Sequence, residues 1–547
     1  MLEPPLKDNK NACHCPRKHC INYFSISLKN MSKNKPTRRE FLQIGAAGIG
    51  AAALLDKITK AENINQNASV FDLEETTVAQ LQAKMRAGEL SAVTLAEKYL
   101  DRIKEIDPKI NSVIELNPDA LKIAGEMDKE RKKGKIRSPL HGIPVLIKDN
   151  IETADRMKTT AGSLALVDAP TPEKDAFIVQ QLRKAGAVIL GKTNLSEWAN
   201  FRSTKSISGW SGRGGQTNNP YILKENPCGS SSGTGAGISA NLAAVGIGTE
   251  TNGSIICPSL RCGLVGLKPT LGLVSRSGII PISHSQDTAG PMTRNVADAA
   301  ALLSVITGAD KLDSITAQSK KAPKDYTKFL DKDGLRGARI GVVRQYFGRS
   351  EKLKALIEPQ FKMLEANGAT LVDVTFPNVP NFSNDETNLL LYEFKADLNK
   401  YLAKRKSQYQ TLADLIKFND ENKAREMPLF GQELFVQAEA KGDLDTPEYR
   451  KILQNLKTAT QRDGIDALVI NNKLDALVSP TVGGAWAVAA IAGYPSITVP
   501  AGMIDGIPAG MLFFGQAFSE PTIIKLAFAY EQLTKARQSP QFIAKSE

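Results

Sequence analysis

The chain contains little histidine: only four of its 547 residues are His, and two of these, His14 and His19, lie within the first 20 residues. A Ser-His-Asp triad would therefore have to use His141 or His284. His141 precedes a Gly-Ile-Pro turn, and His284 lies in a Pro-Ile-Ser-His-Ser loop. Both settings are more typical of structural residues. The sequence thus argues against a histidine-dependent serine hydrolase.

Two other common catalytic signatures are missing. There is no helical His-Glu-x-x-His motif and no paired Cys-x-x-Cys, so a metal hydrolase is disfavoured. The glycine-rich run at 229–237 lacks the Gly-Lys-Ser/Thr ending of a phosphate-binding loop. The sequence therefore predicts neither a metal nor a cofactor.

Cysteines are few and fall into two groups of three: Cys13, Cys15 and Cys20 near the start, and Cys228, Cys257 and Cys262 in the middle of the chain. The Cys-His-Cys run at 13–15 has neither the spacing nor the surroundings of a zinc site. The three central cysteines are an odd set, so they cannot all pair. We expect them to be buried thiols.

The net charge of +12 does not predict nucleic-acid binding, because of where it lies. Residues 1–60 carry +7, which leaves +5 for the remaining 487 residues. No aromatic-basic binding motif accompanies the charge. With 42% hydrophobic residues, the body of the chain has enough apolar content for a large soluble core.

The N-terminal segment resembles an export signal. Residues 37–42, Thr-Arg-Arg-Glu-Phe-Leu, are similar to a twin-arginine motif, and residues 44–55 form a weakly apolar run too short to span a bilayer stably. Met31 is a natural start for such a signal, which calls residues 1–30 into question. The alternative is an ordinary amphipathic arm. We expect residues 1–66 to be an extension with a twin-arginine-type signal, and the mature protein to be periplasmic or secreted, with only transient contact with export machinery.

After this segment, short apolar runs alternate with amphipathic helical patterns. Thr77 and Gln80 form a capping box that opens a helix ending at Gly88, and residues 143–147 are typical of a buried strand. This alternation predicts an α/β fold with a mixed central β-sheet covered by helices on both faces. No repeat or second domain is evident, so residues 67–547 are expected to form one large domain.

Without histidine, a serine can be activated by a neutral lysine. Lowering a lysine pKa from about 10.4 to about 7 costs roughly 4.6 kcal/mol, which burial can supply. Lys148 follows the apolar run at 143–147, although a lysine at a strand end is usually solvated. A Gly/Ser-rich stretch at 228–259 lies between apolar segments and permits close backbone approach. These two regions are the candidate site.

Several blocks, in order along the chain, resemble the amidase signature family, and within it bacterial peptide amidases. They cover about residues 70–540 and lie at 142–150, 228–233, 248–255, 266–270, 286–291 and 492–502. The resemblance implies the amidase signature fold and a Ser-cisSer-Lys triad. Ser254 would be the nucleophile, Ser230 the bridging serine in a cis peptide after Gly229, and Lys148 the base.

The resemblance also implies an oxyanion hole formed by the backbone N–H groups of Thr251, Asn252, Gly253 and Ser254, with Ser231 supporting the loop. Three residues depart from the common family pattern. Asn252 stands where most members have glycine, Glu250 replaces aspartate, and Ile256 replaces arginine. These changes put the usual ion network around the triad in doubt, but not the triad itself.

The resulting expectation is a serine hydrolase that cleaves a linear carboxamide, such as a peptide C-terminal amide, to carboxylate and ammonia through an acyl-enzyme. The alternatives are the ammonia-generating subunit of a tRNA-dependent amidotransferase and a non-catalytic binding protein. Four aromatic residues are candidate pocket walls, although core packing explains them equally well: Trp198, Phe201, Trp210 and Trp486.

Overall fold

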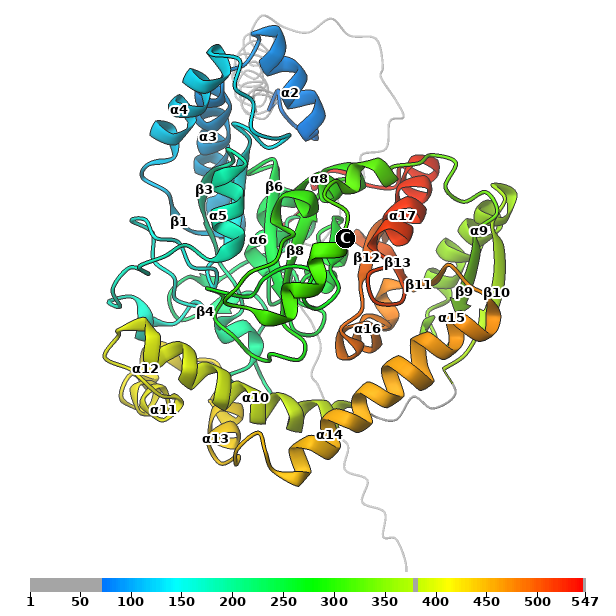
Figure 1. The fold of residues 1–547 in the computed structure, drawn as a ribbon. Coiled ribbons are helices and arrows are strands. Elements are labelled where there is room, and N and C mark those ends of the chain that lie inside the picture. The colour runs from blue at the N-terminus through cyan, green and yellow to red at the C-terminus, as the bar shows by residue number, and fades with distance from the viewer. Residues whose placement is uncertain (1–70, 377–381, 545–547) are drawn as a thin grey trace, which may run out of the picture. The chain divides into compact units, whose positions relative to one another are not determined.

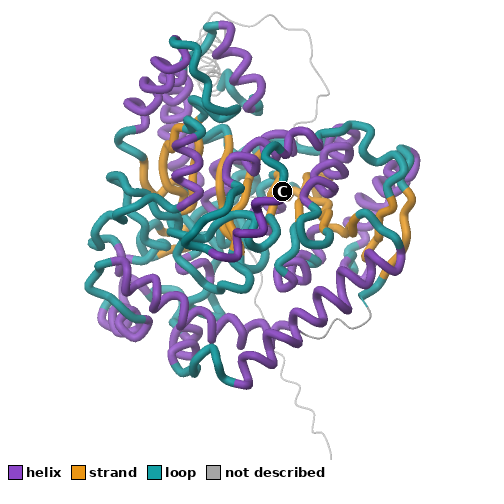
Figure 2. The backbone as a smooth tube through the Cα atoms, in the orientation of Figure 1, coloured by secondary structure: helices purple, strands orange, loops and turns teal. Residues whose placement is uncertain are grey.

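A computed structural model describes residues 71–376 and 382–544 (Figure 1), and these residues belong to one structural unit. In the described part, eleven strands form one mixed sheet in the order β1-β3-β2-β6-β8-β7-β12-β13-β11-β9-β10. Strands run through the middle of the domain with helices around them (Figure 2). The α/β prediction, with a mixed central sheet and helices on both faces, is confirmed.

The strands have the following bounds: β1 Val113–Leu116, β2 Pro144–Lys148, β3 Val188–Thr193, β4 Trp210–Ser211, β5 Gly215–Gln216, β6 Val245–Glu250, β7 Val265–Lys268, β8 Thr288–Thr293, β9 Arg339–Val343, β10 Thr370–Val374, β11 Ala476–Pro480, β12 Ser496–Ile504 and β13 Ile507–Phe514. Strands β4 and β5 form a separate antiparallel pair.

The α-helices are α2 Val78–Ala87, α3 Ala92–Ile110, α4 Ala120–Lys132, α5 Phe177–Lys184, α6 Ser232–Ser239, α7 Ile256–Arg261, α8 Val296–Ile306, α9 Glu351–Ala366, α10 Phe382–Arg405, α11 Leu412–Glu421, α12 Lys423–Glu426, α13 Glu433–Glu439, α14 Pro447–Lys457, α15 Ala467–Asn472, α16 Trp486–Ala492 and α17 Glu520–Thr534. Helices α10 and α14 form a band along the lower side of the domain in Figure 1.

Local signals account for several helix ends. Helix α2 begins with the expected capping box of Thr77 and Gln80 and ends at Gly88, which has a φ of +76°. From the sequence, the next helix is expected to end near Asp107-Pro108, because a proline disfavours the helical conformation of the residue before it; this prediction is wrong. Helix α3 continues through Pro108 to Ile110 and ends at Asn111, which adopts the left-handed conformation.

Three central parallel strands position the candidate site. All five residues of β2 are buried, as are all residues of β3 and β6, because the sheet is covered on both faces here. Strand β2 pairs in parallel with both β3 and β6. The carboxyl ends of the three strands therefore meet at one edge of the sheet, where Lys148 and Glu250 are the last residues of β2 and β6.

Candidate active site

Lys148, at the carboxyl end of β2, is completely buried. Its Nζ lies 2.7 Å from Ser230 Oγ, 2.9 Å from Thr249 Oγ1 and 3.3 Å from the Thr249 carbonyl oxygen. Burial lowers the pKa of Lys148 to about 7, although the negative charges of Asp287 and Glu250 act in the opposite direction. A large share of the amine is therefore neutral near pH 7, with a serine hydroxyl beside it.

Ser230 lies in the loop before α6, and the peptide bond between Gly229 and Ser230 is cis. A Cβ at Gly229 would clash with Ser196 Oγ, so this position requires glycine. The next residue, Ser231, donates its backbone N–H to the Ser254 carbonyl at 3.2 Å and its hydroxyl to the Thr249 carbonyl at 3.0 Å. The loop of Ser230 is thus attached directly to the turn of Ser254.

Ser254 lies in the turn between β6 and α7. Ser254 is 8% exposed, whereas Lys148 and Ser230 are completely buried. Gly253 precedes it with a φ of +77°, and a Cβ added there would lie 2.5 Å from Trp486 Nε1. The hydroxyl of Ser254 is therefore the most accessible of the three functional groups, on a turn that glycine makes possible.

The Glu250 carboxylate organises this turn from within the protein. It accepts backbone N–H groups from Gly253 at 2.8 Å, Ile255 at 2.8 Å and Ile256 at 3.0 Å. Three charge-assisted hydrogen bonds thus hold the residues on both sides of Ser254. They show how the turn is supported where Ile256 replaces the family's usual arginine. The Gly253 N–H is therefore engaged by Glu250, in contrast to the prediction that it contributes to the oxyanion hole.

Side chains from other elements hold the two residues that precede Gly253. Asn252 Nδ2 donates to Glu386 Oε1 of helix α10 at 2.8 Å, and Gln286 Nε2 donates to the same oxygen at 2.8 Å. The Thr251 hydroxyl donates to Asp287 Oδ1 at 2.6 Å. Burial raises the pKa of Asp287 to about 6 and also raises that of Glu386. Hydrogen bonds to residues of other elements therefore fix the position of Thr251 and Asn252, which are part of the predicted oxyanion hole.

The structure brings the predicted residues Lys148, Ser230, Ser231 and Ser254 together with the 251–253 segment. The sequence analysis missed several residues that contact them: Asn150, Thr249, Gln286, Asp287 and Glu386. Asn150 donates to Thr249 Oγ1 at 3.0 Å, beside Lys148. Gln286 and Asp287 lie in one of the family blocks, which could have indicated a role. Glu386 lies in a lysine-rich helical region without any such signal.

The four aromatic residues considered as pocket walls lie in different parts of the structure. Trp198 and Phe201 are buried in one apolar cluster, where they pack against Phe435 and Phe394 respectively. Trp210 is also buried. Trp486, at the start of α16, is half-buried and lies against Gly253. Of the four, Trp486 therefore lies at the turn 251–254, called the nucleophile turn after its predicted nucleophile, Ser254.

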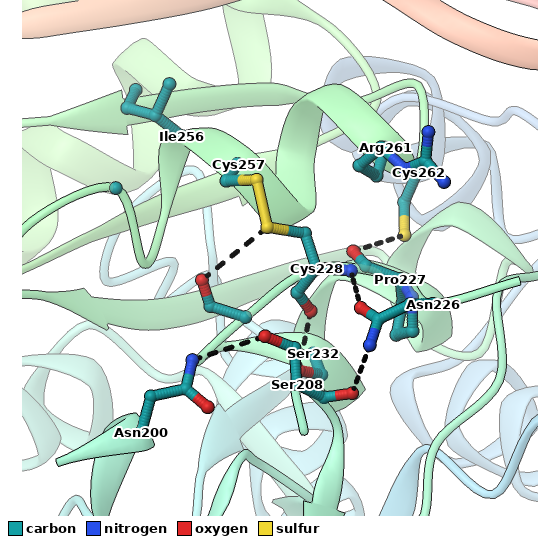
Figure 3. The surroundings of a disulfide bond; sticks show 12 residues. Asn200, Ser208, Asn226, Pro227, Cys228, Ser232, Ile256, Cys257, Arg261 and Cys262 are labelled. Atoms are coloured by element: carbon teal, nitrogen blue, oxygen red, sulfur yellow. Dashed lines mark hydrogen bonds between the residues drawn. A yellow bond between two sulfur atoms is a disulfide. The ribbon is translucent and has the colours of Figure 1, made fainter. Parts of the chain in front are cut away.

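The expectation that the central cysteines are all thiols is wrong for two of them. Cys228 and Cys257 form a disulfide, with their Cα atoms 5.8 Å apart, and Cys262 is a free, buried thiol (Figure 3). An odd cysteine count allowed one pair, but nothing in the spacing showed that the loop at 228 lies beside helix α7. Burial raises the pKa of the Cys262 thiol to about 12, so it stays protonated at neutral pH.

A cavity of about 770 Å³ borders the site. Its lining includes Asn150, Thr249 and Thr251, and it extends between residues 276–288 and helix α10. The cavity therefore reaches the end of β6, which leads into the nucleophile turn, and its volume is in the range that holds small-molecule ligands.

The two histidines considered for a Ser-His-Asp triad have hydrogen-bond partners outside the candidate site. His141 is buried, with Nε2 3.0 Å from the Met127 carbonyl, and His284 Nδ1 lies 2.9 Å from Asp397.

Within 71–376 and 382–544, no three His, Cys, Asp or Glu side chains are grouped to hold a metal ion. In the same ranges, no helix combines the length and apolarity needed to cross a membrane.

Comparison with known proteins shows an enzyme that hydrolyses amide bonds. A family model described as amidase matches residues 94–488, and the chain belongs to this family, the amidase signature enzymes. The crystal structure of peptide amidase from Stenotrophomonas maltophilia is 52% identical, with a TM-score of 0.83, and the match covers 86% of this chain and 99% of that one.

Two further relatives are similar to this chain over most of their length. A probable amidase of Arabidopsis thaliana is 43% identical over 505 residues, covering 90% of this chain and 96% of the relative. One component of the glutamyl-tRNA(Gln) amidotransferase of Thermoanaerobacter pseudethanolicus is 34% identical over 506 residues, covering 86% of this chain and 99% of the relative.

Proposed function

We propose that the protein is a serine amidase in which Lys148, Ser230 and Ser254 form the catalytic triad. The observation that carries the proposal is the 2.7 Å separation between Lys148 Nζ and Ser230 Oγ, for a completely buried lysine whose pKa is about 7. A neutral amine can act as a base, whereas a solvated lysine is protonated at neutral pH.

In this mechanism, Ser254 Oγ attacks the carbonyl carbon of the amide while its proton passes to Ser230 and the Ser230 proton passes to Lys148. The negative oxygen that develops is stabilised by backbone N–H groups of the 251–254 turn other than that of Gly253, which donates to Glu250. The same relay returns a proton to the leaving nitrogen, so ammonia departs and an acyl ester remains on Ser254. Water then attacks this ester by the reverse proton path and releases the carboxylate.

For the substrate, we propose a linear carboxamide, with peptide C-terminal amides as the leading candidates. The 52% identity to a peptide amidase supports this choice. One apolar group at the turn supports it further, since Trp486 lies over Gly253. Its ring offers apolar surface to the residue that carries the amide.

The experiment is ammonia release from a panel of peptide amides and of simple aliphatic and aryl amides, with the wild-type protein and the Ser254→Ala variant. We expect turnover of at least one peptide amide by the wild type alone. Turnover restricted to small aryl amides would reject the peptide-amide proposal, and equal turnover by Ser254→Ala would reject the assignment of the nucleophile.

A second candidate is the ammonia-generating subunit of a tRNA-dependent amidotransferase, because the chain is 34% identical to a component of such an enzyme over 86% of its length. This role requires partner subunits, whereas an independent amidase requires none. Turnover of carboxamides by the purified chain alone, unchanged by the other amidotransferase components, favours the amidase. A non-catalytic binding protein would show no turnover in either condition.

We also propose that the protein is exported, from the twin-arginine-like motif at 37–42, which lies outside the described residues. Cell fractionation tests this proposal. Replacing Arg38 and Arg39 with lysine should retain the protein in the cytosol, and an unchanged distribution between the fractions would reject it.

A further inference from the structure

The Cys228–Cys257 disulfide joins the two segments that carry the proposed catalytic serines. Cys228 lies two residues before Ser230, and Cys257 lies three residues after Ser254. In Figure 3, the bridge connects the loop that enters α6 with helix α7. It is therefore a covalent link between the loop of Ser230 and the helix that follows Ser254.

Cys228, at the loop end of the bridge, is held by several contacts. Cys228 has a φ of +61°, a left-handed conformation that residues with a Cβ adopt only where their surroundings impose it. Its backbone N–H donates to Asn226 Oδ1 at 2.7 Å, and its carbonyl accepts the Ser232 hydroxyl at 2.7 Å (Figure 3). With the side chain bound in the bridge, Cys228 is held at its backbone and at its sulfur.

The helix end is held just as firmly to the nucleophile turn. Cys257 donates its backbone N–H to the Gly253 carbonyl at 2.7 Å. The two residues before it, Ile255 and Ile256, donate theirs to the Glu250 carboxylate. A displacement of Cys228 would therefore be transmitted through the bridge to the turn that presents Ser254.

The bridge differs from the third cysteine of this region in its exposure. Cys228 and Cys257 are both half-buried, whereas Cys262 is completely buried, with Sγ 3.9 Å from the Pro227 carbonyl. A small thiol in solution can therefore reach the bridge more readily than it can reach Cys262.

We propose that the Cys228–Cys257 bridge is a positioning element of the active site, so that full turnover requires its oxidised form and reduction lowers kcat reversibly. A thiolate of a dithiol reductant attacks one sulfur and forms a mixed disulfide. The second thiol of the reductant then releases the protein sulfur. The products are two cysteine thiols and the cyclic disulfide of the reductant. This inference rests on the proposed function, since it assumes that Ser230 and Ser254 act together.

The test compares the oxidised full-length enzyme, the same enzyme treated with dithiothreitol, and the Cys228→Ser/Cys257→Ser variant. Trypsin releases both cysteines and Ser254 in one peptide, residues 225–261, because the chain has no Lys or Arg between Lys224 and Arg261. Alkylation and mass spectrometry of this peptide therefore report the state of the bridge without interference from Cys13, Cys15 or Cys20. Cys262→Ser is the matched control, since it removes a thiol and leaves the bridge intact.

We expect kcat on a carboxamide to fall about 10- to 100-fold on reduction and in the double variant, since small displacements of catalytic groups cost rates of this size. KM should change much less, reoxidation should restore kcat, and Cys262→Ser should behave as the oxidised wild type. The double variant should no longer respond to dithiothreitol. Thermal unfolding identifies an assay temperature at which every form is folded, so loss of fold does not produce the result.

An unchanged kcat in folded enzyme whose peptide 225–261 carries two alkylated cysteines would overturn the proposal. A fall in kcat that merely follows the folded fraction would overturn it as well, because the bridge would then contribute only stability. The rate at which phenylmethylsulfonyl fluoride labels Ser254, read on the same peptide, is an independent readout. It should also fall on reduction, and it does not depend on the choice of amide. Absence of amide turnover would therefore reject the proposed function while this readout still judges the bridge.

Discussion

Asn252 donates its side-chain amide to Glu386 Oε1 over 2.8 Å, joining the nucleophile turn to helix α10, 134 residues further along the chain. Gln286 donates to the same oxygen and also to the Thr251 carbonyl, at 3.2 Å. Where the common family pattern has a glycine without a side chain, this chain therefore has a residue anchored to a distant helix. We therefore expect the backbone N–H groups of this turn, which face the oxyanion in the proposed mechanism, to depend on this anchor for their orientation.

Replacing Glu386 tests the anchor. Glu386→Ala leaves the Asn252 and Gln286 amides without their acceptor, so kcat/KM should fall about 10-fold, equivalent to about 1.4 kcal/mol. Glu386→Gln keeps a carbonyl acceptor and should lose much less. Initial rates of ammonia release measure both effects.

The matched control is Asn252→Gly, which restores the common family pattern. If Glu386 acts through Asn252, the double variant Asn252→Gly/Glu386→Ala should lose less than the two single losses combined. Additive losses would show that Glu386 affects turnover by another route.

The pH dependence follows from Lys148. In the proposed mechanism its neutral form is the active base, and its pKa is about 7, so kcat/KM should rise about 10-fold per pH unit below pH 7 and level off above it. Asp287, whose pKa is about 6, should add a further loss below pH 6 as it is protonated beside Thr251. A neutral amide substrate avoids titration of the substrate itself. A flat profile between pH 5 and 8 would contradict the assignment of Lys148 as the base.

Glu250 should be important for stability as well as for activity. Glu250→Gln removes the charge from three backbone hydrogen bonds and places an NH₂ group against an N–H donor. We expect the free energy of unfolding to fall by about 2–3 kcal/mol, measured by urea denaturation with ammonia release assayed in parallel. Unchanged stability would mean that the three N–H groups find other partners.

Gly253 should not tolerate a side chain. Gly253→Ala would force a φ of +77° on alanine, at a cost of about 1–2 kcal/mol, and would place its Cβ 2.5 Å from Trp486 Nε1. Activity should be almost lost and the melting temperature lowered. Trp486→Ala removes the clash but also the packing of Trp486 against an apolar cluster, so Gly253→Ala is compared in both backgrounds. It should cost less stability in the Trp486→Ala background than in the wild type, and no cost there would show that the backbone conformation contributes nothing.

Much of the fold could be predicted from local pattern. The strand at 143–147 and the helix opened by Thr77 follow from continuous apolar residues and from a capping box, which act within a few residues. Strand β10, Thr370–Val374, was missed because it lies at the edge of the sheet, with half-buried and exposed residues in place of an apolar run. Edge strands carry a weaker hydrophobic signal than central ones.

The candidate site likewise contains residues that the sequence predicted and contacts that only the fold shows. Lys148, Ser230 and Ser254 lie in compact blocks that resemble a family, so their proximity could be predicted. The Cys228–Cys257 pair and the Asn252–Glu386 contact depend on how distant segments pack, which residue spacing does not encode. The neighbours of the triad that came from long-range packing were therefore the ones that the sequence did not reveal.

The most direct test of the central claim is the mass of the acyl-enzyme. The enzyme is mixed with a slowly deacylating aryl amide, quenched within the first turnover, and digested so that Ser254 is recovered in peptide 225–261. The account predicts one acyl group on Ser254 in the wild type and none in Ser254→Ala, with its formation slowed by at least about 10³-fold in Lys148→Ala. An acyl group on another residue, or rapid acylation of Ser254 without Lys148, would contradict it.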